Sequence, residues 1–329
     1  MLAVLSTSDI HYLTLLVGVF IAIGYRNLYG VIPGGLIVPG SLVILLLLSP
    51  IWFATVLGLS FLVYGIYLRW FRRTDYKRRT PMYVLACLSL LLSSLVSLCY
   101  SHWGWMVFSL DSQVGSILPG IIAFNLNKQD VGKVSRAIAL CTGLTLVGVL
   151  GIASFLSATG ILPPASPVDP DLVLQLDYPI IHFFLALGVG YLIYRHQDIR
   201  SGGYMVAPLV ALILLQPLTA IHFLVGCVLV YGMTQFFCCR TLTVGLQRYV
   251  VVFCLSTLYL WGSELGLRSL DPSLPIFQGS THLLSIAMLS YVNDVILYRT
   301  QPILRYMALL IGVSMAGILV VDVLRYLLV

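Results

Sequence analysis

The chain has 329 residues, of which 60% are hydrophobic and only 9% are charged, and its formal net charge is +6. Because an average soluble domain carries about 25% charged residues, this composition excludes a soluble globular protein and predicts an all-α polytopic membrane protein. The first eight residues have neither a basic n-region nor a small-residue cleavage site, so we expect no removable signal peptide.

Hydropathy predicts about twelve membrane segments in two sets of six. In the first half they are residues 9–25, 30–49, 50–68, 81–100, 113–126 and 138–158. Residues 161–177 hold four prolines and three aspartates, which is typical of an exposed linker. We therefore predict a first membrane repeat at 1–160, an extracytoplasmic linker at 161–177 and a second, diverged repeat at 178–329.

The second half repeats the pattern of the first. Residues 187–195 are similar to 16–26, and both stretches end in Tyr-Arg. Residues 217–237 are similar to 50–68, with Val-Tyr-Gly in each. These likenesses predict a tandem duplication.

The positive charges predict the orientation. If the amino terminus is outside, the inside loops begin at positions 26, 69, 127, 195, 240 and 299 and hold every Lys and Arg except Arg268 and Arg325. Such an asymmetry marks the cytoplasmic side, so both termini are predicted to be extracytoplasmic in a cell membrane. Within each half the first three segments run opposite to the next three, which predicts 3+3 inverted repeats.

Two segments are rich in helix breakers. Residues 30–40 read GVIPGGLIVPG, and residues 115–122 read GSILPGII. Proline removes an amide donor and clashes with the preceding turn, so we expect both helices to be interrupted. Each lies in the middle of a predicted triplet, where interrupted helices of transporters form binding sites.

The amide groups at the start of a helix carry partial positive charge and suit an anion. We therefore predict a substrate-binding site that combines Pro/Gly backbone with nearby arginines. Its residues are Arg26, Gly30, Pro33, Gly34, Gly35, Pro39, Gly40, Pro119, Gly120, Arg195, Arg200, Gly202 and Gly203. The alternative is that the prolines only kink helices and the arginines mark the cytoplasmic boundary.

Other charged residues suggest further roles. Asp294 lies within a predicted span. It is expected to be either a relay for protons or cations or the structural partner of a basic residue such as Arg299. Glu264 is expected near the outer face in contact with solvent. The densest basic loop is predicted to dock a partner or anionic lipid, or to act as a topology signal only. It comprises Arg69, Arg72, Arg73, Lys77, Arg78 and Arg79.

No catalytic constellation is visible. The six histidines and seven cysteines show no metal-ligand spacing, and Walker A, G-x-S-x-G and Rossmann motifs are absent from the sequence. We therefore expect no catalytic residue, no metal, no cofactor and no nucleic-acid partner.

The glycine-rich runs resemble the PgsC/CapC family, the membrane subunit of poly-γ-glutamate synthase. Residues 30–40 are similar to that family's G-I-L-P-x-G-L-V-V-P-G, and residues 115–123 to its G-x-x-x-P-G-L-I-A element. The resemblance covers residues 15–150, one family unit. The second half keeps Gly202-Gly203 and Pro208, but Leu209 replaces the last glycine of the motif.

The resemblance implies a non-catalytic membrane subunit of a complex that makes and exports an anionic polyamide. Its partners would be a cytoplasmic ATP-dependent amide ligase, a further membrane-anchored subunit and the anionic polymer, within the lipid bilayer. A secondary transporter of a small carboxylate is the alternative, since inverted repeats suit it equally well. An intramembrane enzyme is disfavoured by the lack of paired catalytic groups.

Overall fold

The computed structural model describes residues 7–71, 80–102, 110–159, 181–197, 206–214, 217–241, 245–270, 281–298 and 301–328. The chain divides into two compact units, Met1–Ala165 and Ser166–Val329, called here the first and the second unit. The regular structure of the described residues is entirely helical. The predicted linker at 161–177 lies outside the described residues.

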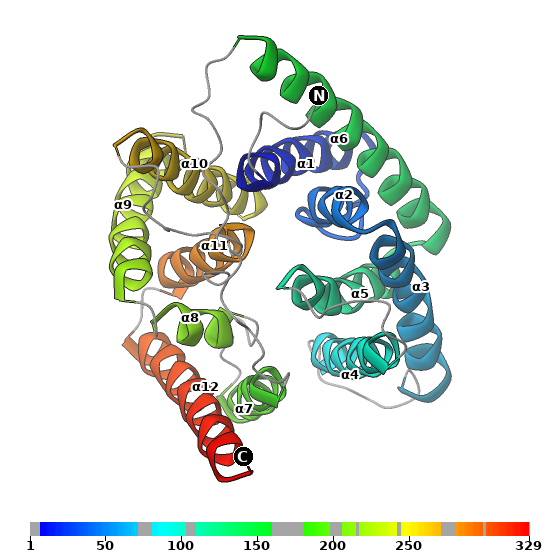
Figure 1. The fold of residues 1–329 in the computed structure, drawn as a ribbon. Coiled ribbons are helices and arrows are strands. Elements are labelled where there is room, and N and C mark those ends of the chain that lie inside the picture. Colours follow the sequence, from blue (N-terminus) through cyan, green and yellow to red (C-terminus); the bar gives the residue numbers. More distant parts are fainter. Residues whose placement is uncertain are drawn as a thin grey trace. The chain divides into compact units, whose positions relative to one another are not determined.

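Each unit contains six α-helices in the described ranges (Figure 1). In the first unit they are α1 (Thr7–Tyr29), α2 (Val38–Leu48), α3 (Pro50–Ile66), α4 (Thr80–His102), α5 (Leu110–Lys128) and α6 (Val131–Thr159), with a π-helical turn η2 (Tyr67–Phe71) after α3. In the second unit they are α7 (Ile181–Gln197), α8 (Val206–Leu214), α9 (Pro217–Thr241), α10 (Leu246–Leu270), α11 (Thr281–Tyr298) and α12 (Gln301–Leu328).

Five helical stretches of the described chain are long and apolar enough to cross a bilayer: Asp9–Tyr29, Pro50–Phe71, Val131–Leu156, Pro217–Thr241 and Leu246–Leu270. The predicted class, a helical membrane protein, is therefore confirmed. Helix α2 has only 11 residues. At about 1.5 Å per residue it covers roughly half of a hydrocarbon core. Twelve crossings and the inverted repeats stay predictions.

The helices of the first unit pair in a regular way. Helix α1 packs against α2 and α6, and α2 also packs against α3, α5 and α6. Helix α3 packs against α4 and α5, α4 against α5, and α5 against α6. The second unit has the same pairings when α7 to α12 take the places of α1 to α6.

Helix α2 lies at the centre of the first unit (Figure 1). All of its residues from Val38 to Leu45 are buried. A core cluster joins Val38 and Leu42 to side chains of α3, α5 and α6, among them Val56, Ile122 and Ile138. In a bilayer, backbone outside a helix is tolerated only where protein or a cavity covers it. Burial of α2 therefore permits the interruption that precedes it.

Candidate functional site

The interruption predicted within residues 30–40 is present at residues 30–37, whereas Pro39 and Gly40 belong to helix α2. The N–H of Gly30 donates to the carbonyl of Arg26 at 2.7 Å, and the φ angle of Gly30 is +70°. A glycine in this left-handed conformation is a common way to end a helix, because it has no Cβ to clash. Helix α1 therefore stops at Tyr29, and Arg26 occupies its last turn.

Residues 31–37 form the non-helical connection to α2; with Gly30, we call residues 30–37 the interrupted segment. Gly34 has φ +69° and Gly35 has φ +143°, values that residues with a side chain rarely adopt. A Cβ at Gly34 would lie 3.1 Å from Cδ1 of Ile138, and one at Gly35 would lie 3.2 Å from Cγ2 of Ile121. Both glycines are thus required by backbone conformation and by space.

Two amide side chains of the α5 end hold the interrupted segment, and we call them the amide clamp. Asn125 donates from Nδ2 to the carbonyl of Gly34 and to that of Ile121. The N–H of Ile32 donates to Oε1 of Gln129 at 3.1 Å. Partly buried backbone groups that would lack partners in a bilayer are satisfied in this way.

The amide clamp was missed by the sequence reasoning. Asn125 is 91 residues from Gly34 along the chain, so no local pattern links them. The available signal was the spacing of Asn125 and Gln129, four residues apart at the end of an apolar helix. Residues at that spacing lie on one face of a helix, and polar groups in membrane helices commonly bond across helices.

The predicted binding residues of the interrupted segment differ in exposure. Pro33 and Gly34 are buried, Arg26 and Gly35 are half-buried, and Gly30 is exposed. Around the same end of the first unit lie the exposed basic residues Lys128, Lys133 and Arg136. Since clustered positive charge raises the local concentration of anions, this end of the unit is suited to attract an anionic ligand.

Gly40 makes a close approach, but to another helix. A Cβ on Gly40 would lie 2.8 Å from the carbonyl oxygen of Thr14, and one on Gly18 would lie 2.6 Å from the amide nitrogen of Gly40. Both contacts are with backbone atoms of the α1–α2 crossing. Pro39 and Gly40 are buried there, as small residues are at tight helix crossings in membranes.

The predicted interruption at Pro119 and Gly120 is wrong. Helix α5 runs from Leu110 to Lys128 with Pro119 inside it. The N–H of Gly120 donates to Oγ of Ser89 at 3.0 Å, and a Cβ on Gly120 would lie 3.0 Å from the carbonyl oxygen of Leu85. A neighbouring helix thus supplies a hydrogen-bond partner next to the proline, as is usual for prolines in membrane helices.

Most of the other predicted site residues lie outside the described residues. They are Arg200, Gly202 and Gly203 of the predicted binding site, and Arg72, Arg73, Lys77, Arg78 and Arg79 of the basic loop. Arg69 is exposed on η2 and Arg195 is exposed in the last turn of α7. Asp294 belongs to α11, but the surroundings of its side chain are not described.

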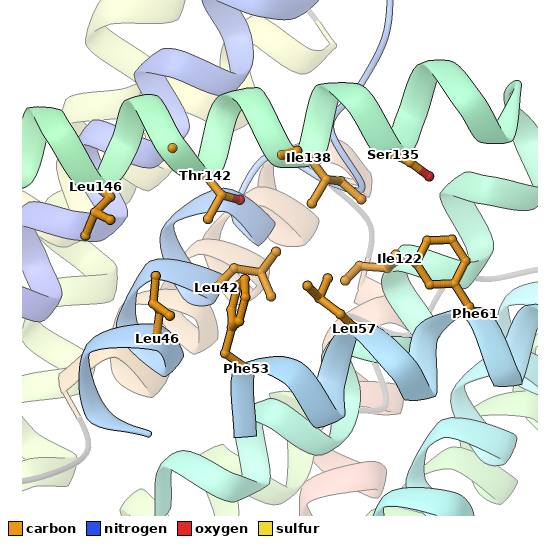
Figure 2. Close-up of a pocket in the computed structure, with 12 residues that line it drawn as sticks. Leu42, Leu46, Phe53, Leu57, Phe61, Ile122, Ser135, Ile138, Thr142 and Leu146 are labelled. Carbon is orange, nitrogen blue, oxygen red and sulfur yellow. The ribbon is translucent and has the colours of Figure 1, made fainter. Parts of the chain in front are cut away.

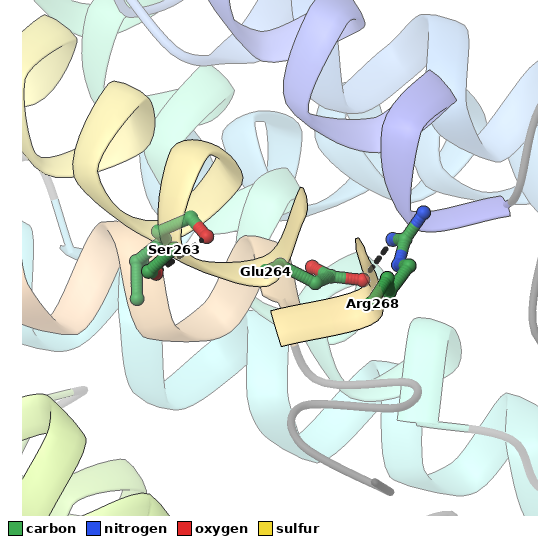
Figure 3. A network of polar contacts seen from close by, with 4 residues as sticks. Ser263, Glu264 and Arg268 are labelled. Carbon is green, nitrogen blue, oxygen red and sulfur yellow. Dashed lines mark hydrogen bonds and ion pairs between the residues drawn. The ribbon is translucent and has the colours of Figure 1, made fainter. Parts of the chain in front are cut away.

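The second unit holds a buried ion pair that sequence reasoning placed in solvent. Figure 3 shows Arg268 donating to Glu264 one turn earlier on α10, and each side chain is only 7% exposed. The expected solvation of Glu264 is therefore wrong. Opposite charges four residues apart on a helix are a pattern that predicts such a pair. Because the pair has no net charge, it is easier to place in an apolar environment than either charge alone.

Breaking this ion pair is expected to destabilise the protein. Arg268→Met removes the basic group that pairs with the buried Glu264 carboxylate, and breaking a buried pair in this way costs about 3–5 kcal/mol. The double variant Glu264→Gln/Arg268→Met removes both charges and is expected to recover most of that loss. Thermal unfolding of the detergent-purified protein measures both. Equal melting temperatures for the single and double variants would contradict a structural pair.

The amide clamp makes a second prediction, based on donors and acceptors. Asn125→Asp removes the donor to two carbonyls and places an anion beside them, whereas Gln129→Glu keeps the acceptor that Ile32 uses. We expect Asn125→Asp to cost about 1–3 kcal/mol, the usual loss for unsatisfied buried groups. Gln129→Glu is expected to be close to wild type in stability. Thermal unfolding of the detergent-purified variants is the measurement, and the reverse order of effects would rule out the clamp as described.

These features define a class of protein. It is a helical membrane protein in which a non-helical segment between the first two helices is held inside the first unit. The family model described as Capsule biosynthesis CapC matches residues 17–135 and 185–281. The chain belongs to this CapC family, and its process is capsule biosynthesis. It is 29% identical to the capsule biosynthesis protein CapC of Bacillus anthracis over 136 residues, 41% of this chain and 89% of that protein. No solved structure matches the chain.

Proposed function

We propose that this protein is the membrane subunit of a complex that synthesises and exports a capsule polymer of the poly-γ-glutamate type. In this complex a cytoplasmic ATP-dependent amide ligase forms the polymer bonds. The chain itself is non-catalytic and guides the anionic product into or through the membrane together with a further membrane-anchored subunit.

The observation that carries the proposal is the interrupted segment, which lies within the first family match at residues 17–135. Its glycines are held in conformations that only glycine readily adopts, and Arg26 lies at its start. Basic side chains of α5 and α6 surround the same end. A polymer with one carboxylate per residue is the ligand class that such a positively charged entrance favours.

We further propose that the chain is a tandem duplication of an inverted 3+3 repeat. The equal helix pairings of the two units support the duplication. Within the first unit, the helix pairings stay the same when α1, α2 and α3 change places with α4, α5 and α6. The contact of α1 with α6, for example, then corresponds to the contact of α4 with α3. This internal correspondence supports the inversion. With Lys and Arg marking the inside, both termini are extracytoplasmic and the basic loop faces the ligase.

The proposal is tested by purifying the full chain from membranes of a strain that carries the neighbouring capsule genes. An ATP-dependent ligase is expected in the purified complex, and deletion of this chain is expected to abolish surface polymer. Replacing four loop residues, Arg72, Arg73, Arg78 and Arg79, by Gln is expected to release the ligase, whereas Arg195→Gln retains it. If the loop variant still co-purified with the ligase, the basic loop would be rejected as the docking site.

A secondary transporter of a small carboxylate is the second candidate, because the inverted pairing within the first unit is typical of that class. Reconstitution separates the two. A transporter accumulates labelled glutamate in vesicles that contain this chain alone, whereas the proposed subunit does not. Uptake by the chain alone, without the ligase, would overturn the synthase proposal.

A further inference from the structure

The first unit contains an apolar cavity of about 460 Å³ between α2, α3, α5 and α6 (Figure 2). Leu42 and Leu46 line it from α2, and Phe53, Leu57 and Phe61 line it from α3. This size is within the range of sites that bind small molecules, which are mostly apolar with a few polar groups.

One polar group in the cavity wall has an unusual environment. Thr142 of α6 is 7% exposed, it lines the cavity, and its hydroxyl has no hydrogen-bond partner among the described residues. Figure 2 shows its side chain directed from α6 into the cavity. The hydroxyl of Thr145, three residues later, has a partner within the helix, because it donates to the carbonyl of Cys141 at 2.7 Å.

A buried hydroxyl without a partner costs free energy, so the cavity is suited to a ligand that brings an acceptor to Thr142. The rest of that ligand must be apolar, because the walls are formed by leucine, isoleucine and phenylalanine side chains. An acyl chain with an ester carbonyl has this combination of groups.

The two helices that form facing walls of the cavity, α3 and α6, carry basic residues beyond the same end of it. Ser135 and Phe61 lie at one end and Leu46 and Leu146 at the other (Figure 2). Arg136 follows Ser135 and is exposed. It precedes Ala139 and Gly143, two cavity residues, by three and seven positions, so it shares their helix face. Helix α3, the facing wall, continues into η2, which carries the exposed Arg69.

We propose that this cavity binds an anionic glycerophospholipid of the surrounding bilayer. Its phosphate lies at the end marked by Arg136 and Arg69, an ester carbonyl accepts from the Thr142 hydroxyl, and the acyl chain extends toward Leu46 and Leu146. Arg136 and Thr142 are six residues apart, about 9 Å along a helix, which an arginine side chain and a glycerol backbone together span.

The lipid site adjoins the interrupted segment. Ile138 lines the cavity, and its Cδ1 is the atom nearest to a Cβ built on Gly34, at 3.1 Å. A bound acyl chain therefore supports the side chain against which Gly34 packs. This lipid requirement is independent of the identity of the polymer.

The test uses the full chain in nanodiscs of phosphatidylcholine that contain a trace of phosphatidylglycerol with a photoreactive diazirine in its acyl chain. Phosphatidylcholine with the same acyl chain is the comparison probe. Adducts of the phosphatidylglycerol probe are expected to concentrate on residues 139–146 and on α3. Arg136→Gln is expected to reduce the preference for phosphatidylglycerol about fivefold.

Matched variants isolate the hydroxyl. Thr142→Val is expected to reduce labelling of the cavity about fivefold, Thr142→Ser to retain it, and Thr145→Val to leave it unchanged because that hydroxyl bonds within α6. Size-exclusion profiles show which variants are folded. Labelling that is spread evenly over the exposed helices and is insensitive to Thr142→Val would overturn the proposal.

A second arm repeats the labelling in cell membranes that contain the assembled complex. Adducts on the same residues are expected there. Their disappearance in cell membranes, with labelling retained in nanodiscs, would show that a helix of another subunit covers the cavity in the complex, and the lipid would be rejected as its occupant.

Discussion

Gly34→Ala is expected to reduce surface polymer by about tenfold or more, whereas Gly30→Ala retains most of it. The difference arises because only the alanine at position 34 clashes with a neighbouring side chain, which costs about 1–3 kcal/mol. The two glycines have nearly equal φ angles, +69° and +70°, so alanine is placed in a left-handed conformation at both positions. A Cβ on Gly34 would lie 3.1 Å from Cδ1 of Ile138 and 3.2 Å from Cγ1 of Val38, whereas a Cβ on Gly30 meets no described atom within 4 Å.

A suppressor tests the same contact. Ile138→Val removes Cδ1, so the double variant Gly34→Ala/Ile138→Val is expected to recover part of the activity lost in Gly34→Ala. Membrane abundance, measured by an epitope tag, serves as the control for insertion. Equal loss in Gly30→Ala and Gly34→Ala would show that strain alone matters and that packing against α6 does not.

The second large effect is expected at the α1–α2 crossing. Gly18→Ala places a Cβ 2.6 Å from the amide nitrogen of Gly40 and 2.7 Å from its Cα. Backbone atoms cannot move aside as a side chain does, so the helices must separate. Such overpacking costs about 1–3 kcal/mol or more, and Gly18→Ala is expected to lower the thermal unfolding temperature and the folded yield sharply.

Gly24→Ala is the matched control on the same helix. A Cβ on Gly24 meets no atom of the described residues within 4 Å, and alanine in a helix interior is about 1 kcal/mol more favourable than glycine. The two substitutions are therefore expected to shift stability in opposite directions. If Gly18→Ala were as stable as Gly24→Ala, the close crossing would be absent from the protein in a membrane.

The first interruption could be predicted from the sequence because its causes are local. Gly30 ends α1, and Pro33, Gly34 and Gly35 follow within five residues. Pro119 was misjudged because its outcome depends on another helix, where Ser89 accepts from Gly120. A single proline in a long apolar helix is tolerated when a neighbour supplies such a partner, and a sequence read in isolation does not reveal that neighbour.

The candidate site could likewise be predicted only where its causes are local in the sequence. Gly34 was predicted from a motif and Arg26 from its charge nearby, but Asn125 was not predicted, because its bond to Gly34 joins residues 91 positions apart. The cavity at Thr142 was likewise invisible, since threonine in a membrane helix normally bonds to its own backbone, as Thr145 does. The pairing of Glu264 with Arg268, by contrast, is predictable from their spacing of four residues.

The amide clamp also constrains the order of biosynthesis. Asn125 and Gln129 leave the ribosome some 90 residues after the segment they hold, and domains form progressively as synthesis proceeds. Until α5 is in the bilayer, the carbonyl of Gly34 and the N–H of Ile32 lack these partners. Nascent chains that stop before α5 therefore expose polar backbone to lipid, which makes them natural targets for membrane quality-control proteases.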